Sequence, residues 1–198
     1  MALVDDAKWW TSTRHQWAAM LTASEMPAAD PRQLAMRFNA GTDEIPEVVN
    51  NAAPAYKVGD KAQFWISNSD TQERRRITAT LMVATAHVAM WVQDGVRYNQ
   101  RDLEASARRF DEETYPTNRE FFGSEWTPGV DNDPRLHILH AFGLGSSVAG
   151  YYSSADGVSS KISSFSNEKE MFYVNLDNNW QGGLNYTPLF ALPVLLAA

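Results

Sequence analysis

Histidines and carboxylates are the side chains that most often bind metal ions or transfer protons, and His137 and His140 lie three positions apart. A spacing of three places two side chains on one face of a helix but on opposite faces of a strand. The segment from 135 to 141 is predicted to be a strand. We therefore expect strand packing or solvent exposure for both histidines, with a shared metal ion or a catalytic role as the alternative.

Paired carboxylates can bind calcium or carry out glycoside hydrolysis, and three such pairs occur here: Glu112 with Glu113, Asp131 with Asp133, and Glu168 with Glu170. None has the supporting pattern of such a site. Asp131 and Asp133 are followed at once by Pro134, without the regularly spaced oxygen ligands and the closing glutamate of a calcium loop. A turn is favoured there, and calcium remains the alternative. Glu168 and Glu170 are expected to be solvated residues at the start of the next strand.

Several kinds of catalytic site are missing from the sequence. It has no cysteine, which excludes thiol nucleophiles and cysteine-bound zinc. Gly143 to Ser147 lacks the Gly-Lys-Ser/Thr ending of a phosphate loop, and no Gly-x-Ser-x-Gly elbow of a serine hydrolase occurs. The residues alone thus predict no catalytic residue and no metal ligand set in this chain.

The composition limits the partners and the location. The net charge is -7 with a pI near 5.0, and Lys and Arg are scattered, so neither nucleic acid nor a membrane is an expected partner. The single basic run, 74–76, is expected on a solvated hairpin edge, with a polyanion contact as the alternative. The apolar end, Leu189 to Ala198, is too short for a membrane span. Residues 1–20 lack the build of a signal peptide.

The predicted elements change in kind along the chain. Residues 7–40 are expected to be helical, with a short second helix from Pro31 to Phe38, and residues 41–56 are expected to form an extended connector. Short strands alternate with helices beyond the connector, and the helix that begins at Asn99 is expected to break at Tyr115-Pro116. A new helix then runs to Gly123. The predicted strands are 61–67, 77–83, 87–93, 135–141, 148–152 and 170–176. This pattern indicates an α+β domain.

Residues from about 54 to 190 resemble the amino-terminal half of bacterial zincin metallopeptidases, namely the immune inhibitor A-like and related secreted proteases. The stretches that carry this resemblance are Tyr56 to Asp60 with Phe64-Trp65, Val88 to Val92, Phe110 to Pro116, Leu136 to His140, Val148 to Asp156, and Ser166 to Asp177. The resemblance implies a twisted mixed β-sheet with a backing helix, the zincin amino-terminal subdomain, over residues 54–198. Residues 1–53 would be a helical, propeptide-like leader with a linker.

In that family the last strand is followed by a helix with the motif His-Glu-x-x-His. Its two histidines share a helical face and bind Zn²⁺, and the glutamate activates the metal-bound water. Here the segment from Leu192 to Leu196 stands where the motif is expected, and the motif is absent. The resemblance therefore implies a truncated or frame-shifted part of a secreted zinc endopeptidase. This part is expected to be inactive alone, and zinc is expected only in the full-length protein.

The resemblance also places the strand from Met171 to Asp177 near the substrate cleft. As an edge strand it would pair with an extended peptide or protein substrate, so Phe172, Tyr173, Val174 and Asn175 are the expected substrate-binding residues. The alternative is a non-enzymatic α+β binding module that holds a peptide or glycan through an edge strand and aromatic side chains. Trp65 and Trp91 lie in predicted strands, where use in the core is favoured over a sugar-binding face.

Overall fold

The computed structural model describes residues 30–38 and 44–177, together with residues 16, 18 and 20. The predicted short helix is confirmed as α2 (Pro31–Phe38), whereas the remainder of the expected helical leader and the apolar segment 189–198 lie outside the described residues. Residues 44–56 contain no helix or strand, as expected for a connector. Within the described chain, no helix is both long and apolar enough to cross a lipid bilayer.

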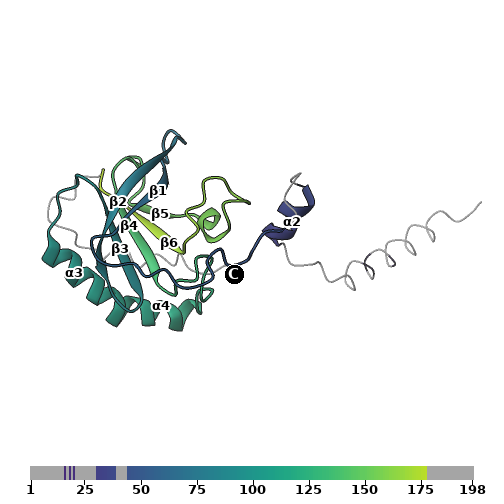
Figure 1. Ribbon diagram of the computed structural model, residues 1–198, viewed down its shortest axis with the longest axis horizontal. Helices are drawn as coiled ribbons and strands as arrows, with labels where there is room; N and C mark the ends of the chain where they lie inside the picture. The colour runs from purple at the N-terminus through teal and green to yellow at the C-terminus, as the bar shows by residue number, and fades with distance from the viewer. Residues whose placement is uncertain (1–15, 17, 19, 21–29, 39–43, 178–198) are drawn as a thin grey trace, which may run out of the picture.

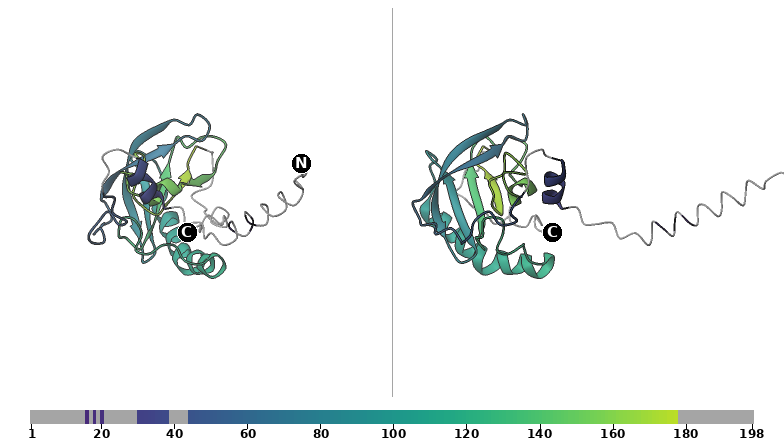
Figure 2. Two further views of the ribbon diagram at one scale, coloured as in Figure 1. Left: turned by 90° about the vertical axis from the view of Figure 1, so that its right-hand side faces the viewer. Right: turned by 45° about the vertical axis from the view of Figure 1, so that its right-hand side comes forward.

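Six strands form one curled, mixed sheet in the order β1-β2-β3-β4-β6-β5 (Figures 1 and 2). Strands β1 to β3 are antiparallel neighbours, β3, β4 and β6 run parallel, and β5 pairs antiparallel with β6. The predicted α+β class with a mixed sheet is therefore confirmed. The bounds are β1 (Lys61–Ser67), β2 (Arg74–Ala84), β3 (Val88–Gln93), β4 (Leu136–Ala141), β5 (Gly150–Tyr152) and β6 (Met171–Asn175).

One face of the sheet is covered by a helical segment that connects β3 to β4 (Figure 1). It consists of α3 (Gln100–Arg109), a π-helical turn (Phe110–Thr114) and α4 (Tyr115–Phe122). The start at Asn99 is confirmed, because the Asn99 side chain caps the helix by accepting from the N–H of Arg101 at 3.0 Å.

The predicted new helix with Pro116 in its first turn is confirmed as α4, which runs to Gly123. The chain nevertheless stays helical at Tyr115-Pro116, where a full break was predicted, because the π-helical turn connects α3 to α4. The N–H of Tyr115 donates to the carbonyl of Phe110, five residues back. This wider turn accommodates Pro116, which has no N–H and whose ring would clash with a carbonyl in a regular helix interior. The helix then ends at Gly123, which has a positive φ of 88°. Glycine adopts this conformation without strain because it has no β-carbon.

Strand β4 lies at the centre of the molecule, and all six of its residues are buried. Its alternate residues face two separate apolar cores: Leu136 and Ile138 pack under the helices, and Leu139 packs on the other face with the fully buried Trp91. Core use is thus confirmed for Trp91. His137 and His140 point to opposite faces of the sheet, and both are buried. This confirms strand packing for both histidines and excludes a shared face.

Strand β6 lies inside the sheet, so its predicted role as an edge strand is wrong. It has β4 on one side and β5 on the other. The chain folds back through the loop after β5 and inserts β6 between its neighbours, which leaves β5 as the edge. Any strand addition at this end of the sheet must therefore use Gly150–Tyr152 instead of the β6 backbone.

The opposite edge, β1, is closed by side chains. The N–H of Trp65 donates to Asn167 Oδ1 at 2.7 Å, and Asn167 Nδ2 donates back to the Trp65 carbonyl at 2.9 Å. The N–H of Ser67 donates to the hydroxyl oxygen of Tyr151, which is a β5 residue, at 3.0 Å. The curl of the sheet therefore brings its two edge strands to the same loop, residues 153–170.

Replacing Asn167 with alanine tests this closure. The change leaves the Trp65 N–H without its partner and removes the shorter of the two hydrogen bonds to the Trp65 carbonyl, which keeps only the Tyr173 hydroxyl at 3.4 Å. We therefore expect a loss of about 1–3 kcal/mol in the free energy of unfolding. Urea denaturation followed by tryptophan fluorescence measures it. Asn51→Ala, at an exposed position, is the control and should change stability by less than about 0.5 kcal/mol. Equal stability of the two variants would contradict the proposed closure.

Candidate functional site

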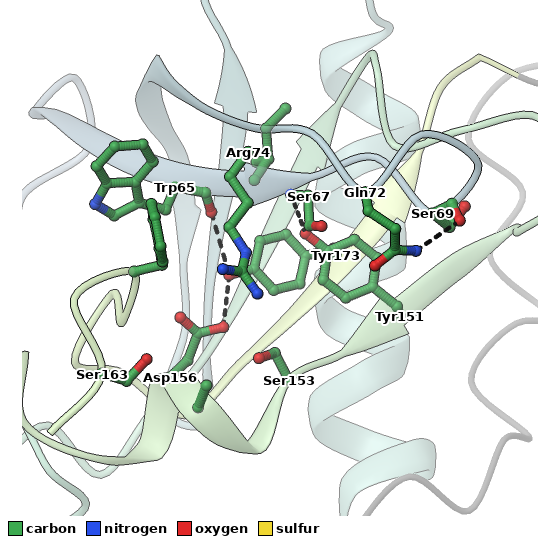
Figure 3. A pocket seen from close by; sticks show the side chains of 13 residues that line it. Trp65, Ser67, Ser69, Gln72, Arg74, Tyr151, Ser153, Asp156, Ser163 and Tyr173 are labelled. Carbon is green, nitrogen blue, oxygen red and sulfur yellow. Dashed lines mark hydrogen bonds between the residues drawn. The ribbon is translucent and has the colours of Figure 1, made fainter.

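A cavity of about 290 Å³ lies between the outer side of β1 and the end of β5, and we call it the slot (Figure 3). Its walls come from β1, β2, β5, β6 and the loop that follows β5. Segments more than 100 positions apart in the sequence meet here, as the contact between Trp65 and Asn167 shows. The slot therefore exists only because the sheet curls.

The floor of the slot is formed by two stacked tyrosines and a buried carboxylate. The rings of Tyr151 and Tyr173 lie 4.2 Å apart at an angle of 17°. The Tyr173 hydroxyl donates to Asp156 Oδ2 at 2.7 Å, and the N–H of Asn167 donates to Asp156 Oδ1 at 2.8 Å. Burial raises the pKa of Asp156, although these hydrogen bonds act in the opposite direction. Burial also raises the pKa of Tyr151 to about 12.

The rim of the slot consists of alternating cationic and aromatic side chains. The Arg74 guanidinium lies 4.5 Å from the centre of the Phe165 ring, and Phe165 meets Trp65 edge-on at 5.0 Å. Arg76, which does not line the slot, lies over the Trp65 ring at 5.2 Å. The run 74–76 is exposed on a hairpin strand, as predicted. These contacts attach the loop carrying Phe165 to the β1–β2 hairpin.

The outer side of β5 presents backbone hydrogen-bonding groups. The N–H of Asn175 donates to the Ala149 carbonyl at 2.9 Å, and the register pairs Tyr151 with Tyr173. Hydrogen-bonded pairs alternate with non-bonded pairs in an antiparallel ladder, so the N–H and C=O groups of Gly150 and Tyr152 point away from β6. In the part of the chain that the structure describes, no further strand lies beyond β5.

Of the four residues predicted to bind substrate, only Tyr173 lines the slot. Phe172 and Val174 contact the core under the helices, and Asn175 donates its side-chain amide to the carbonyls of Gly145 and Val148. Alternation along β6 separates them in this way. Sequence reasoning did not single out Arg74 or Asp156 for this region, because no local motif indicates that β2 and the loop after β5 will meet.

A second group of ionisable residues, Asp131, Asp133 and His137, is fully buried at the start of β4. Their potential ligand atoms lie within 4.8 Å of one another, which is close enough to consider a metal ion. The turn predicted for this segment is confirmed, since the Asp131 side chain accepts from the N–H of Asp133 at 3.0 Å. Both carboxylates already have cations: Lys169 lies 3.0 Å from Asp131, and Arg135 pairs with Asp133 at 2.7 Å.

The protonation of His137 argues further against a metal in this group. Trp91 Nε1, which can only donate, donates to His137 Nδ1 at 3.0 Å, so the proton of the neutral ring sits on Nε2. Nε2 faces Asp131 and Asp133 at 3.5 and 3.6 Å. Burial lowers the pKa of His137 and favours this neutral form. With Nε2 protonated and the carboxylates paired, the group does not fit a divalent cation.

Glu170, expected to be solvated, is instead half-buried beside this group. Burial is the main reason that its pKa is raised to about 7, and the negative charge of Asp131 adds to the effect. Glu170 Oε2 is buried without a hydrogen-bond partner. The expectation failed because the loop that brings Glu170 to β6 also packs it against the 129–133 turn, where Gly129 lies close to its carboxylate.

The variant Glu170→Gln tests this environment through pH. The folded state holds the proton more tightly than the unfolded chain, so wild-type stability falls as pH rises from about 4.5 to about 7. Glutamine removes that loss. The free energy of unfolding of the variant, relative to that of wild type, should therefore rise by on the order of 2 kcal/mol between pH 5 and pH 8. Urea unfolding at each pH measures it. The exposed Glu120→Gln should show no such gain, and a flat difference for Glu170→Gln would contradict the assignment.

Lys169→Met tests whether the buried group is an ion-pair network. It leaves the Asp131 carboxylate without its cation, and we expect a loss of about 3–5 kcal/mol in the free energy of unfolding. Lys57→Met, at an exposed position, should have little effect. EDTA should leave the thermal midpoint of the wild-type protein unchanged. A midpoint that falls with EDTA and recovers on adding a divalent cation would show instead that the group binds metal.

The comparisons with known proteins add no family assignment. No protein-family model matches the chain, and a search of curated proteins found no significant match. The slot, the open β5 edge and the buried ion pairs therefore carry the functional argument, together with the resemblance in the sequence.

Proposed function

We propose that this chain is the amino-terminal, peptide-holding part of a zincin-type metalloendopeptidase. The observation that carries the proposal is the open edge of β5 directly beside a slot with aromatic and charged walls. The mixed sheet with a helical segment on one face agrees with the arrangement that the resemblance implies. A role in holding peptide requires nothing beyond these described residues.

An extended peptide would bind by adding a strand to β5. Its backbone would pair with the outward N–H and C=O groups of Gly150 and Tyr152, which gives affinity independent of the peptide sequence. Its side chains would alternate between two faces, and one of them would enter the slot. The chain would in this way fix the direction and register of the substrate.

Hydrolysis of the peptide bond would require a zinc-activated water that the described residues do not provide. The nearest candidate ligands, Asp131, Asp133 and His137, are occupied by cations and by the Nε2 proton. No His-Glu-x-x-His motif occurs in the sequence. We therefore assign binding and orientation of the substrate to this chain, and no step of bond cleavage.

A non-enzymatic peptide-binding module is the second candidate. It is favoured by the same observation, because the β5 edge and the slot are complete without a metal site. Both candidates predict peptide binding, and they differ only in whether the protein also contributes to cleavage.

Peptide binding is tested with Tyr152→Pro. Proline removes the outward N–H of β5 and leaves the bonds to β6 intact, so binding should weaken at least about 10-fold. Fluorescence anisotropy with labelled, extended peptides from casein measures the affinity. Tyr152→Ala is the matched control: it removes the ring but keeps the N–H, and should retain most of the affinity. Equal binding by Tyr152→Pro and wild type would contradict strand addition.

Casein cleavage separates the two candidates. The chain alone should release no fluorescent fragments from labelled casein, with or without added zinc. A longer form that includes the coding sequence directly after residue 198 should cleave casein, and replacing the glutamate of its His-Glu-x-x-His motif should abolish this. Peptide binding by both forms without cleavage by either would favour the binding module over the peptidase.

A further inference from the structure

We infer that the slot is a subsite that selects a glutamate or aspartate side chain of the bound peptide, with Arg74 as the residue that recognises the carboxylate. This inference deepens the proposed peptide binding at β5 and rests on it. It assigns a specificity to the site that neither the fold nor the edge strand requires.

Arg74 is held in place for such a contact. Its side chain extends from β2 into the slot (Figure 3), and its guanidinium lies over the Phe165 ring at 4.5 Å. A guanidinium carries five N–H donors, so the contact with the ring leaves donors available for a carboxylate. Arg74 is an exposed residue, and its contact with Phe165 favours one orientation of the side chain, which reduces the conformational entropy lost on binding a carboxylate.

The charge of Arg74 is also available. Across the described ranges, 30–38 and 44–177, no carboxylate lies within ion-pair distance of its guanidinium. Its two neighbours differ: Arg75 donates to the Phe142 carbonyl at 2.6 Å, and Arg76 covers Trp65 outside the slot. Of the three consecutive arginines, only Arg74 lines the cavity.

The floor of the slot determines where a carboxylate would sit. Asp156 is only 3% exposed, and both of its oxygens accept hydrogen bonds from Tyr173 and Asn167. Its position would repel a carboxylate that entered deeply. A ligand carboxylate is therefore expected beside the Arg74 guanidinium. The hydroxyl-bearing residues Ser153 and Ser163 lie on either side of Asp156 in the same cavity (Figure 3). The ligand's methylene groups would contact the tyrosine floor.

Because the protein is acidic overall, a preference for glutamate in the bound peptide would point to a specific contact. With a net charge of -7, the chain as a whole repels an acidic peptide, so general electrostatic attraction cannot produce a preference for glutamate. A measured preference would have to come from a local cation. Screening at moderate salt would then reduce the general repulsion more than the direct contact with Arg74.

The test uses labelled nonapeptides with blocked ends that are identical except for one residue, which is Glu, Gln or Lys and is moved through each position. For wild type, at one position, the Glu peptide should bind roughly 10-fold tighter than the Gln peptide. Arg74→Gln should remove this difference, and Arg74→Lys should keep part of it. Arg76→Gln, the matched control on the same strand, should keep it in full.

The outcomes separate the inference from the proposed function. Peptides that bind with no preference for Glu over Gln at any position, or a preference that survives Arg74→Gln, would overturn the subsite and leave strand addition standing. Absence of binding by every peptide would overturn both. The comparison of Glu and Gln peptides on wild type needs no variant, so the inference is tested even if Arg74→Gln folds poorly.

Discussion

The closure of the β1 edge by the side chains of Asn167 and Tyr151 is the contact on which the rest of this molecule depends. An edge strand exposes a row of unpaired N–H and C=O groups. At Trp65 a single asparagine amide satisfies both kinds of group, at 2.7 and 2.9 Å. This contact holds the loop after β5 against the β1 edge of the curled sheet. The slot is the space that remains between the two edges.

The two edges of the sheet thereby differ in what they can do. On β1 the backbone groups of Trp65 and the N–H of Ser67 are bonded within the chain, whereas the groups of Gly150 and Tyr152 on β5 point outward from the sheet. Among the described residues, the β5 edge is therefore the place at which we propose that a peptide strand adds, next to the cavity that Arg74 lines. An open edge alone accepts many sequences, and the neighbouring cavity is what makes selection among them physically plausible.

The ionisable residues are used in two distinct ways. At the start of β4 the charges neutralise one another inside the protein, and the Trp91 donor sets the tautomer of His137. In such a network the carboxylates are already neutralised by Lys169 and Arg135, which explains why proximity alone is a poor guide to a metal site. At the slot, the charges of Arg74 and Asp156 lie at the rim and the floor, so the cation remains accessible to a ligand.

The sequence by itself determined the local elements. Alternation predicted the strand 77–83, and short runs of strand-forming residues bounded by turn residues predicted the others. The side chain of Asn99 marked the start of α3, and the Asp131-Asn132-Asp133 turn followed from its residue types. The placement of His137 and His140 on opposite faces of the sheet also followed from strand geometry. These features depend on residues only a few positions apart in the chain. The spacing of apolar residues and the capping residues of helices are therefore visible in the sequence itself.

The tertiary structure alone decided the order of the strands and hence the site. It placed β6 inside the sheet and β5 at the edge, since a strand's pattern records which faces are buried but not which strand lies beside it. It brought Arg74 to Tyr173 and raised the pKa of Glu170 to about 7 by packing it against a distant turn. Such contacts join residues far apart in the chain, and their energies arise only when the curl of the sheet removes water from between them.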